Sequence, residues 1–142
     1  PATVLALTPL AGLSSLLGRL AGGWMLDRFW APAVGFVLLS LPALSCWMLA
    51  GESIGSFEAA LSILLIGFAL GVEYDLIAFL ISRYFGLRGY ATIYGVLYVA
   101  FASGAGVGPL VFGWAFDRQG NYDAALFVSS IALIASAALL LL

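Results

Sequence analysis

Two carboxylates lie deep inside an apolar run of the sequence, where acids are rare. Glu73 and Asp75 fall within residues 57–82, a stretch that is closed by Arg83. Glu73 precedes Arg83 by ten residues, which corresponds to about 15 Å along a helix that rises 1.5 Å per residue. In a membrane-spanning helix this depth is near the midplane, where a charged acid costs about 2.5–3.5 kcal/mol on insertion scales. Each acid therefore needs a partner, a proton or water.

The two acids point to different sides of the predicted helix. They are two residues apart, which is about 200° around a helix axis, so they cannot share a face. Asp75 continues a stripe of small and polar residues, namely Gly67, Gly71, Asp75, Ala78 and Ser82. The helix is thus expected to border a cavity. Either both acids pair with arginines and fix the packing, or they form a proton or substrate site. We predict that Glu73 binds the proton, because the glycine stripe that includes Asp75 suits helix contact.

Arg19 lies within another apolar run, about 12 Å of helix before that run ends. Three roles follow from this position. Its guanidinium could pair with an acid of residues 57–82, it could bind an anionic substrate, or its side chain could extend to the membrane interface.

Three tyrosines repeat at helical spacing further along the chain. Tyr90, Tyr94 and Tyr98 fall at i, i+4 and i+8, so they lie on one helix face. We include Tyr94 and Tyr98 among the candidate substrate or proton residues. The sequence leaves open whether this face lines a cavity or packs against neighbouring helices.

A glycine-rich segment with a proline follows the tyrosines. Gly104 and Gly108 have the small-xxx-small spacing that allows helices to approach closely. Pro109 removes one backbone hydrogen bond and favours a bend. Close packing explains the glycines, and a bend in a transport helix is the functional alternative. The segment is not a phosphate-binding loop, because it has no Gly-Lys-Ser/Thr.

The composition indicates a membrane protein. Of the 142 residues, 64% are hydrophobic and 8% are charged, whereas a soluble domain carries about 25% charged residues. The sequence has no lysine, no histidine and no basic tract, so nucleic acid is not an expected partner. The single Cys46 has no cysteine to pair with in this sequence and cannot form a cysteine-based metal site. We expect no cofactor and no metal.

Five apolar runs predict an all-α bundle of five membrane-spanning helices in a single domain, at about residues 3–26, 32–50, 57–82, 90–116 and 123–142. Asp123 is a plausible helix-start residue. Both ends of the sequence lie in or near apolar segments, so we expect a fragment of a longer protein. Four of the five arginines lie in the second half of the first run or just after the ends of the first and third runs. The positive-inside rule therefore places those ends in the cytoplasm.

An eleven-residue segment recurs in the chain. Residues 18–28 and 108–118 are identical at six positions, and both copies end in Gly-Trp-x-x-Asp-Arg. The copies lie three helices apart, so they should face opposite sides of the membrane. Inverted three-helix repeats of this kind occur in secondary transporters. We interpret the shared polar residues as gate elements: Gly23, Asp27, Arg28, Gly113, Asp117 and Arg118.

With these residues in view, the chain resembles the C-terminal half of a major facilitator superfamily transporter, helices eight to twelve. The segment from Gly23 to Phe29 resembles the cytoplasmic signature of that family, although Trp30 and Pro32 depart from its usual downstream residues. Residues 83–88, 93–95, 108–109 and 116–122 look like the corresponding region of monocarboxylate and oxalate/formate-type members.

The resemblance implies a secondary transporter that uses alternating access without an ATP site. Its substrate would be a small solute, such as an organic anion, with transport coupled to protons. Its partners would be the bilayer, the substrate and the missing N-terminal half, in a membrane expected to be the bacterial inner membrane. Two functions other than transport are also considered for this sequence. One is a non-transporting membrane module of the same fold, such as a receptor or assembly subunit, which the sequence does not exclude. An intramembrane aspartyl protease would use Tyr74-Asp75, but every Gly-x-Gly here lacks the following Asp.

Overall fold

The computed structural model describes residues 2–50 and 54–142. They form five helices and, within these two ranges, no strand, which confirms the predicted all-α fold. Glu52, which falls between the predicted helices 32–50 and 57–82, lies outside the described residues. The helices are α1 (Ala2–Arg28), α2 (Ala31–Leu49), α3 (Ser56–Tyr84), α4 (Tyr90–Gln119) and α5 (Asp123–Leu139).

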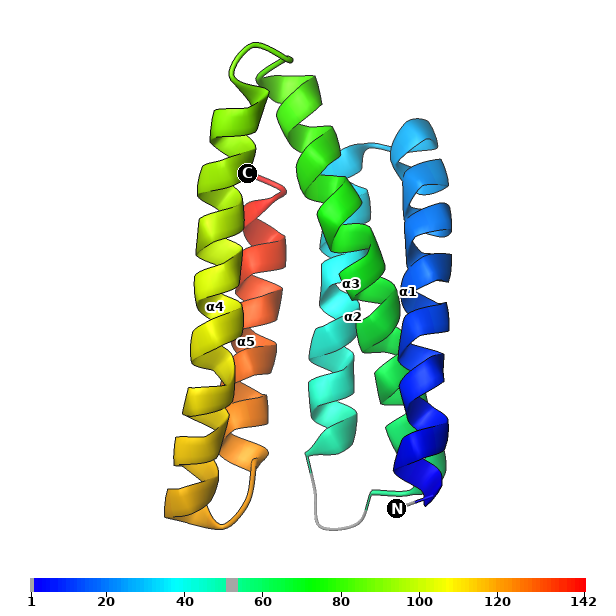
Figure 1. Ribbon diagram of the computed structural model, residues 1–142, viewed down its shortest axis with the longest axis vertical. Coiled ribbons are helices and arrows are strands. Elements are labelled where there is room, and N and C mark those ends of the chain that lie inside the picture. The colour runs from blue at the N-terminus through cyan, green and yellow to red at the C-terminus, as the bar shows by residue number, and fades with distance from the viewer. Residues whose placement is uncertain (1, 51–53) are drawn as a thin grey trace.

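The helices are arranged as a bundle in which α3 is central (Figure 1). Helix α3 runs beside α1 and also packs against α2, while α2 packs against α5. Helix α4 touches α3 and α5 much less extensively. Helices α1 and α3 end at the same end of the bundle, the end at which α4 begins. The two arginine-flanked helix ends therefore lie on one side, as the sequence predicted.

Glycines allow α1 and α3 to pack closely. A Cβ added at Gly67 would lie 2.8 Å from the carbonyl oxygen of Ala11, and one at Gly71 would overlap the carbonyl oxygen of Ser15. Gly18 makes the reciprocal approach to the backbone of Phe68. Small residues at such a crossing let two backbones come together. The predicted use of the Gly67 and Gly71 stripe for helix contact is confirmed.

Local signals set the helix ends. The carboxylate of Glu58 accepts a hydrogen bond of 2.9 Å from the backbone N–H of Gly55, which stabilises the start of α3. Gly120 ends α4 with a φ of 71°, a left-handed conformation that glycine adopts without strain. Helix α5 begins at Asp123, as predicted.

Large apolar side chains cover the outside of the bundle. Leu20, Phe57 and Leu110 are each more than 70% exposed. By length and composition, α2, α3 and α4 can each cross a membrane, and α5 is a shorter apolar helix of 17 residues. An apolar exterior on helices of this length is typical of an integral membrane protein. That α1 and α5 also span the membrane stays a prediction.

Candidate functional site

The guanidinium of Arg19 lies over an aromatic ring of the neighbouring helix. Its central carbon is 5.7 Å from the centroid of Tyr74 on α3, within the range of a cation–π interaction. Arg19 forms no ion pair with Asp75 or Glu73 in the part of the chain that the structure describes. Of the three roles that the sequence left open, pairing with an acid is therefore not the one adopted here. The side chain is exposed on α1 and can meet an anion.

The close packing of α1 and α3 also positions Asp75. Gly67 approaches Ala11, and Gly71 approaches Ser15 and the backbone nitrogen of Arg19. Both helices run in the same direction, so one further turn brings Asp75 level with Arg19. The register of the two backbones therefore places Asp75, which is half-buried, at about the same level of the bundle as Arg19.

Glu73 is half-buried on α3, two residues from Asp75. It lies in the same helical turn as Tyr74, the residue that contacts Arg19. Asp75 follows the glycine stripe on the α1 side, so Glu73 faces away from that stripe. The two acids thus occupy different environments, although the role of each stays a prediction.

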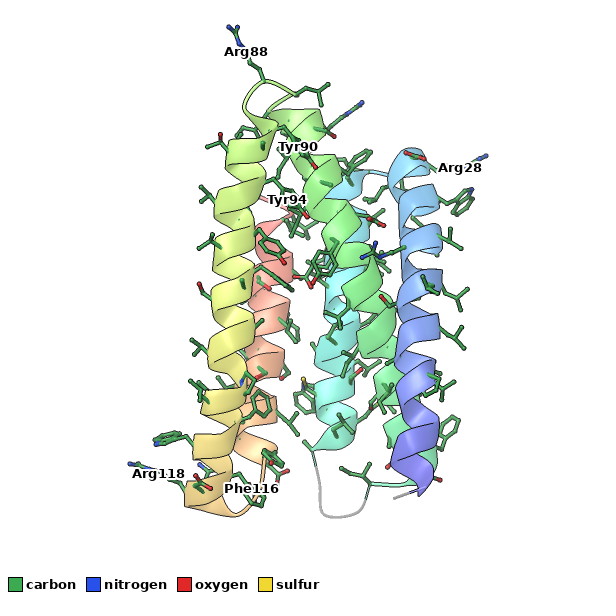
Figure 2. The ribbon with its side chains drawn as sticks, viewed as in Figure 1. Arg28, Arg88, Tyr90, Tyr94, Phe116 and Arg118 are labelled. Carbon is green, nitrogen blue, oxygen red and sulfur yellow. The ribbon has the colours of Figure 1, made fainter. Side chains whose placement is uncertain are left out.

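A row of aromatic rings runs from Tyr74 onto α4. Tyr74 meets Phe101 edge to face, with ring centroids 5.3 Å apart. Phe101 is 6.2 Å from Tyr98, Tyr98 stacks on Tyr94 at 6.3 Å, and Tyr94 stacks on Tyr90 at 5.8 Å. In Figure 2, Tyr90 and Tyr94 lie near the end of α4 that is close to the Arg88 loop. We call these five residues the aromatic strip. Tyr94 and Tyr98 are thus linked to Arg19 through ring contacts.

The glycines of α4 have no close neighbour among the described residues. A Cβ added at Gly104 or Gly108 would meet nothing within 4 Å. The close approach predicted for them is therefore not made to α1, α2, α3 or α5 as described. Helix α4 continues through Pro109 to Gln119, and a functional bend there stays a prediction.

The gate residues of the first copy lie at the end of the bundle where α1 and α3 both finish. Asp27, Arg28 and Arg83 line one polar pocket of about 520 Å³. The guanidinium of Arg28 lies 5.9 Å from the ring centroid of Trp24. Asp27 forms no ion pair with any residue that the structure describes, although Arg28 and Arg83 line the same pocket.

The second copy of the segment repeats this arrangement at the other end. The guanidinium of Arg118 lies 4.5 Å from the ring centroid of Trp114, again four residues earlier. Figure 2 shows Arg28 and Arg118 at opposite ends of the bundle. Gly23 and Gly113 both face open space, since a Cβ at either would meet nothing within 4 Å. The inverted symmetry itself stays a prediction.

If the chain transports a solute, as the sequence resemblance implies, replacing Asp27 with asparagine should slow transport while leaving substrate affinity nearly unchanged. Asp27 lies in the last turn of α1, where a carboxylate opposes the helix dipole, and it lines the pocket at the helix end rather than the site around Arg19. Uptake kinetics of the full-length protein would give a lower maximal rate and a similar KM. A large rise in KM at an unchanged rate would contradict this gate role.

The sequence alone missed two residues that join the site together. Tyr74 and Phe101 link Arg19 on α1 to the tyrosines of α4. Phe101 follows Tyr98 by three residues, so it continues the tyrosine face. The spacing of all aromatic residues, rather than of the tyrosines alone, therefore indicates it. Tyr74 could be recognised only when α1 was placed beside α3.

The comparisons with known proteins point to a transporter. The chain is 26% identical over 137 residues to the protein named monocarboxylate transporter 9 of chicken, Gallus gallus. The match covers 96% of this chain and 27% of that protein, so the chain spans about a quarter of the length of the relative it matches. No family model matches the chain, and no solved structure matches it. The chain is therefore similar, at a distance, to part of a membrane transporter.

Proposed function

We propose that this chain is part of a secondary membrane transporter that carries a small organic anion of monocarboxylate type by alternating access. The distant similarity to a protein named as a monocarboxylate transporter supports the proposal. The apolar exterior and the three helices long enough to cross a membrane support it as well. A transporter relative is also compatible with a protein that is not an enzyme.

Arg19 is the observation on which the proposed anion site rests. It is a permanent cation on an apolar helix, and it contacts an aromatic ring rather than a carboxylate. A monocarboxylate could take up the donors that a cation–π contact leaves unused, because guanidinium binds carboxylates through two parallel hydrogen bonds. Tyr94 and Tyr98 would lie along the path that leads to this site.

Glu73 is proposed as the proton-binding residue and Asp75 as the fixed acid near Arg19. A proton on Glu73 would remove the cost of a charge in the bilayer interior. Movement of the proton and the anion together would also carry no net charge across the membrane. The different environments of the two acids support this division of roles.

The architecture is proposed to be the C-terminal half of a major facilitator superfamily transporter, with inverted repeats. The two Trp–Arg pairs at opposite ends of the bundle support this arrangement. Its partners would be the lipid bilayer, the small-molecule substrate and the N-terminal half of the same protein. An integral membrane location follows. The matching relative is a chicken protein, so the bacterial inner membrane expected from the sequence gains no support from it.

Replacing Arg19 with glutamine is expected to raise the KM for acetate by about 10- to 100-fold, because a hydrogen bond to a charged group contributes about 1.5–3 kcal/mol. The measurement is uptake of labelled acetate into liposomes that contain the full-length protein. Arg88→Gln is the matched control, since it removes the same charge from the exposed loop between α3 and α4. An unchanged KM for Arg19→Gln would contradict the anion site.

A further inference from the structure

The aromatic strip extends much further than a small acid would need. From Tyr90 to Phe101 it covers twelve residues of α4, and the two ends are about 16 Å apart along the helix at 1.5 Å per residue. A two- or three-carbon acid held by Arg19 could reach no further than Tyr74 and Phe101. Among the described residues, α4 contacts α3 and α5 only lightly and Tyr98 is 51% exposed, whereas Tyr90 and Tyr94 are partly buried. The strip is therefore most open at Tyr98.

The spacing of the rings determines how a ligand could use them. Neighbouring centroids are 5.8–6.3 Å apart along α4. A flat ring inserted between two others needs about 7 Å, twice the carbon contact distance of about 3.5 Å. No ring can therefore enter between these. A ligand ring would instead lie across the strip and meet it edge to face, as Tyr74 already meets Phe101 at an interplanar angle of 64°.

An aromatic ligand suits such a strip better than an aliphatic one. The face of an aromatic ring is electron-rich and its edge is electron-poor, so edge-to-face pairs gain attraction beyond the area that they bury. A saturated ring of the same size buries a similar area without that gain. The guanidinium of Arg19, next to Tyr74 at one end of the strip, supplies the charge that a carboxylate requires.

We propose that the transported anion is an aromatic monocarboxylate, with its carboxylate on Arg19 and its ring on Tyr74, Phe101 and Tyr98. This inference rests on the proposed function and adds the substrate class. Tyr94 and Tyr90 extend the same surface toward the end of the bundle where α4 begins. The ring of the anion meets aromatic side chains along this whole path.

The test compares three acids of equal charge in liposomes that contain the full-length protein. Phenylacetate and cyclohexylacetate have the same carbon skeleton and differ in aromaticity, and acetate has no ring. Phenylacetate is expected to show a KM about tenfold below that of cyclohexylacetate, with acetate weaker than both. This comparison needs no mutant, so a variant that fails to fold cannot obscure it.

Two variants then assign the preference to the strip. Phe101→Leu and Tyr98→Leu should each reduce the preference for phenylacetate over cyclohexylacetate toward equality, while Tyr98→Phe should keep it. Tyr122→Leu is the matched control, because Tyr122 also stacks on a phenylalanine, Phe116 at 4.8 Å, but lies at the opposite end of α4. It should leave the preference unchanged.

The outcomes distinguish failure of the aromatic substrate class from failure of the proposed function. Transport of acetate with equal KM values for phenylacetate and cyclohexylacetate would overturn the aromatic substrate class and leave the proposed function standing. Transport of none of the three acids would overturn both. A preference for phenylacetate that survives Phe101→Leu and Tyr98→Leu would overturn the role of the strip.

Discussion

Replacing Gly71 with alanine is expected to destabilise the protein by about 3 kcal/mol, at the upper end of the cost of overpacking a core. The added methyl group would overlap the carbonyl oxygen of Ser15 and lie 3.1 Å from the backbone nitrogen of Arg19. Both atoms belong to a helix backbone, which cannot rotate away as a side chain can. Helix α1 would have to move, and the most extensive helix pairing in the chain would open.

The measurement is the thermal unfolding midpoint of the full-length protein in detergent. Gly12→Ala is the matched control, because Gly12 lies on α1 and a Cβ there would meet nothing within 4 Å. Alanine favours a helix over glycine by about 1 kcal/mol, so the control should hold or raise the midpoint. Equal midpoints for the two variants would show that the α1–α3 distance is not fixed by Gly71.

Replacing Glu73 with glutamine is expected to abolish uptake driven by a pH gradient while leaving exchange of substrate across the membrane. Glutamine resembles the protonated acid but cannot release a proton. The nearest charged residue along α3 is Asp75, two residues away, and Arg19 on α1 contacts the intervening Tyr74 rather than Glu73. Helix α2 carries no charged residue, and α4 carries none before its last turns. Few other groups could therefore bind the proton in place of Glu73.

Uptake into liposomes at outside pH 6 and inside pH 7.5, compared with equal pH on both sides, would measure the effect. We expect the gradient to stimulate the unmodified protein and not the Glu73→Gln variant. Asp75→Asn is the counterpart, and it should keep the response to the gradient because Asp75 is assigned a fixed role near Arg19. Full stimulation of Glu73→Gln would make this acid a structural residue.

The helices could be predicted from sequence because their signals are local. Runs of apolar residues closed by Arg28, Arg83 and Gly120 gave helix ends within a few residues of the structure. The Gly67 and Gly71 stripe correctly indicated a helix contact, since such close packing requires small residues at i and i+4.

The candidate site was harder to predict because it depends on which helices are neighbours. An acid of α3 was one of three roles that the sequence left open for Arg19, but the residue of α3 that contacts Arg19 is Tyr74. Periodicity placed Tyr94 and Tyr98 on one face, yet only the position of α3 beside α4 connects that face to Arg19 through Phe101. Contacts between helices distant in sequence leave no local pattern.

The two Trp–Arg pairs have a consequence for how the protein responds to its lipid environment. Trp24 with Arg28 and Trp114 with Arg118 lie at opposite ends of the bundle, and both tryptophans are 58% exposed. Tryptophan and arginine prefer the headgroup region of a bilayer. With α1 spanning the bilayer as predicted, pairs held there on α1 and α4 would couple the tilt of these helices to bilayer thickness. Since α1 carries Arg19 and α4 carries the aromatic strip, lipid chain length would act directly on the distance between them.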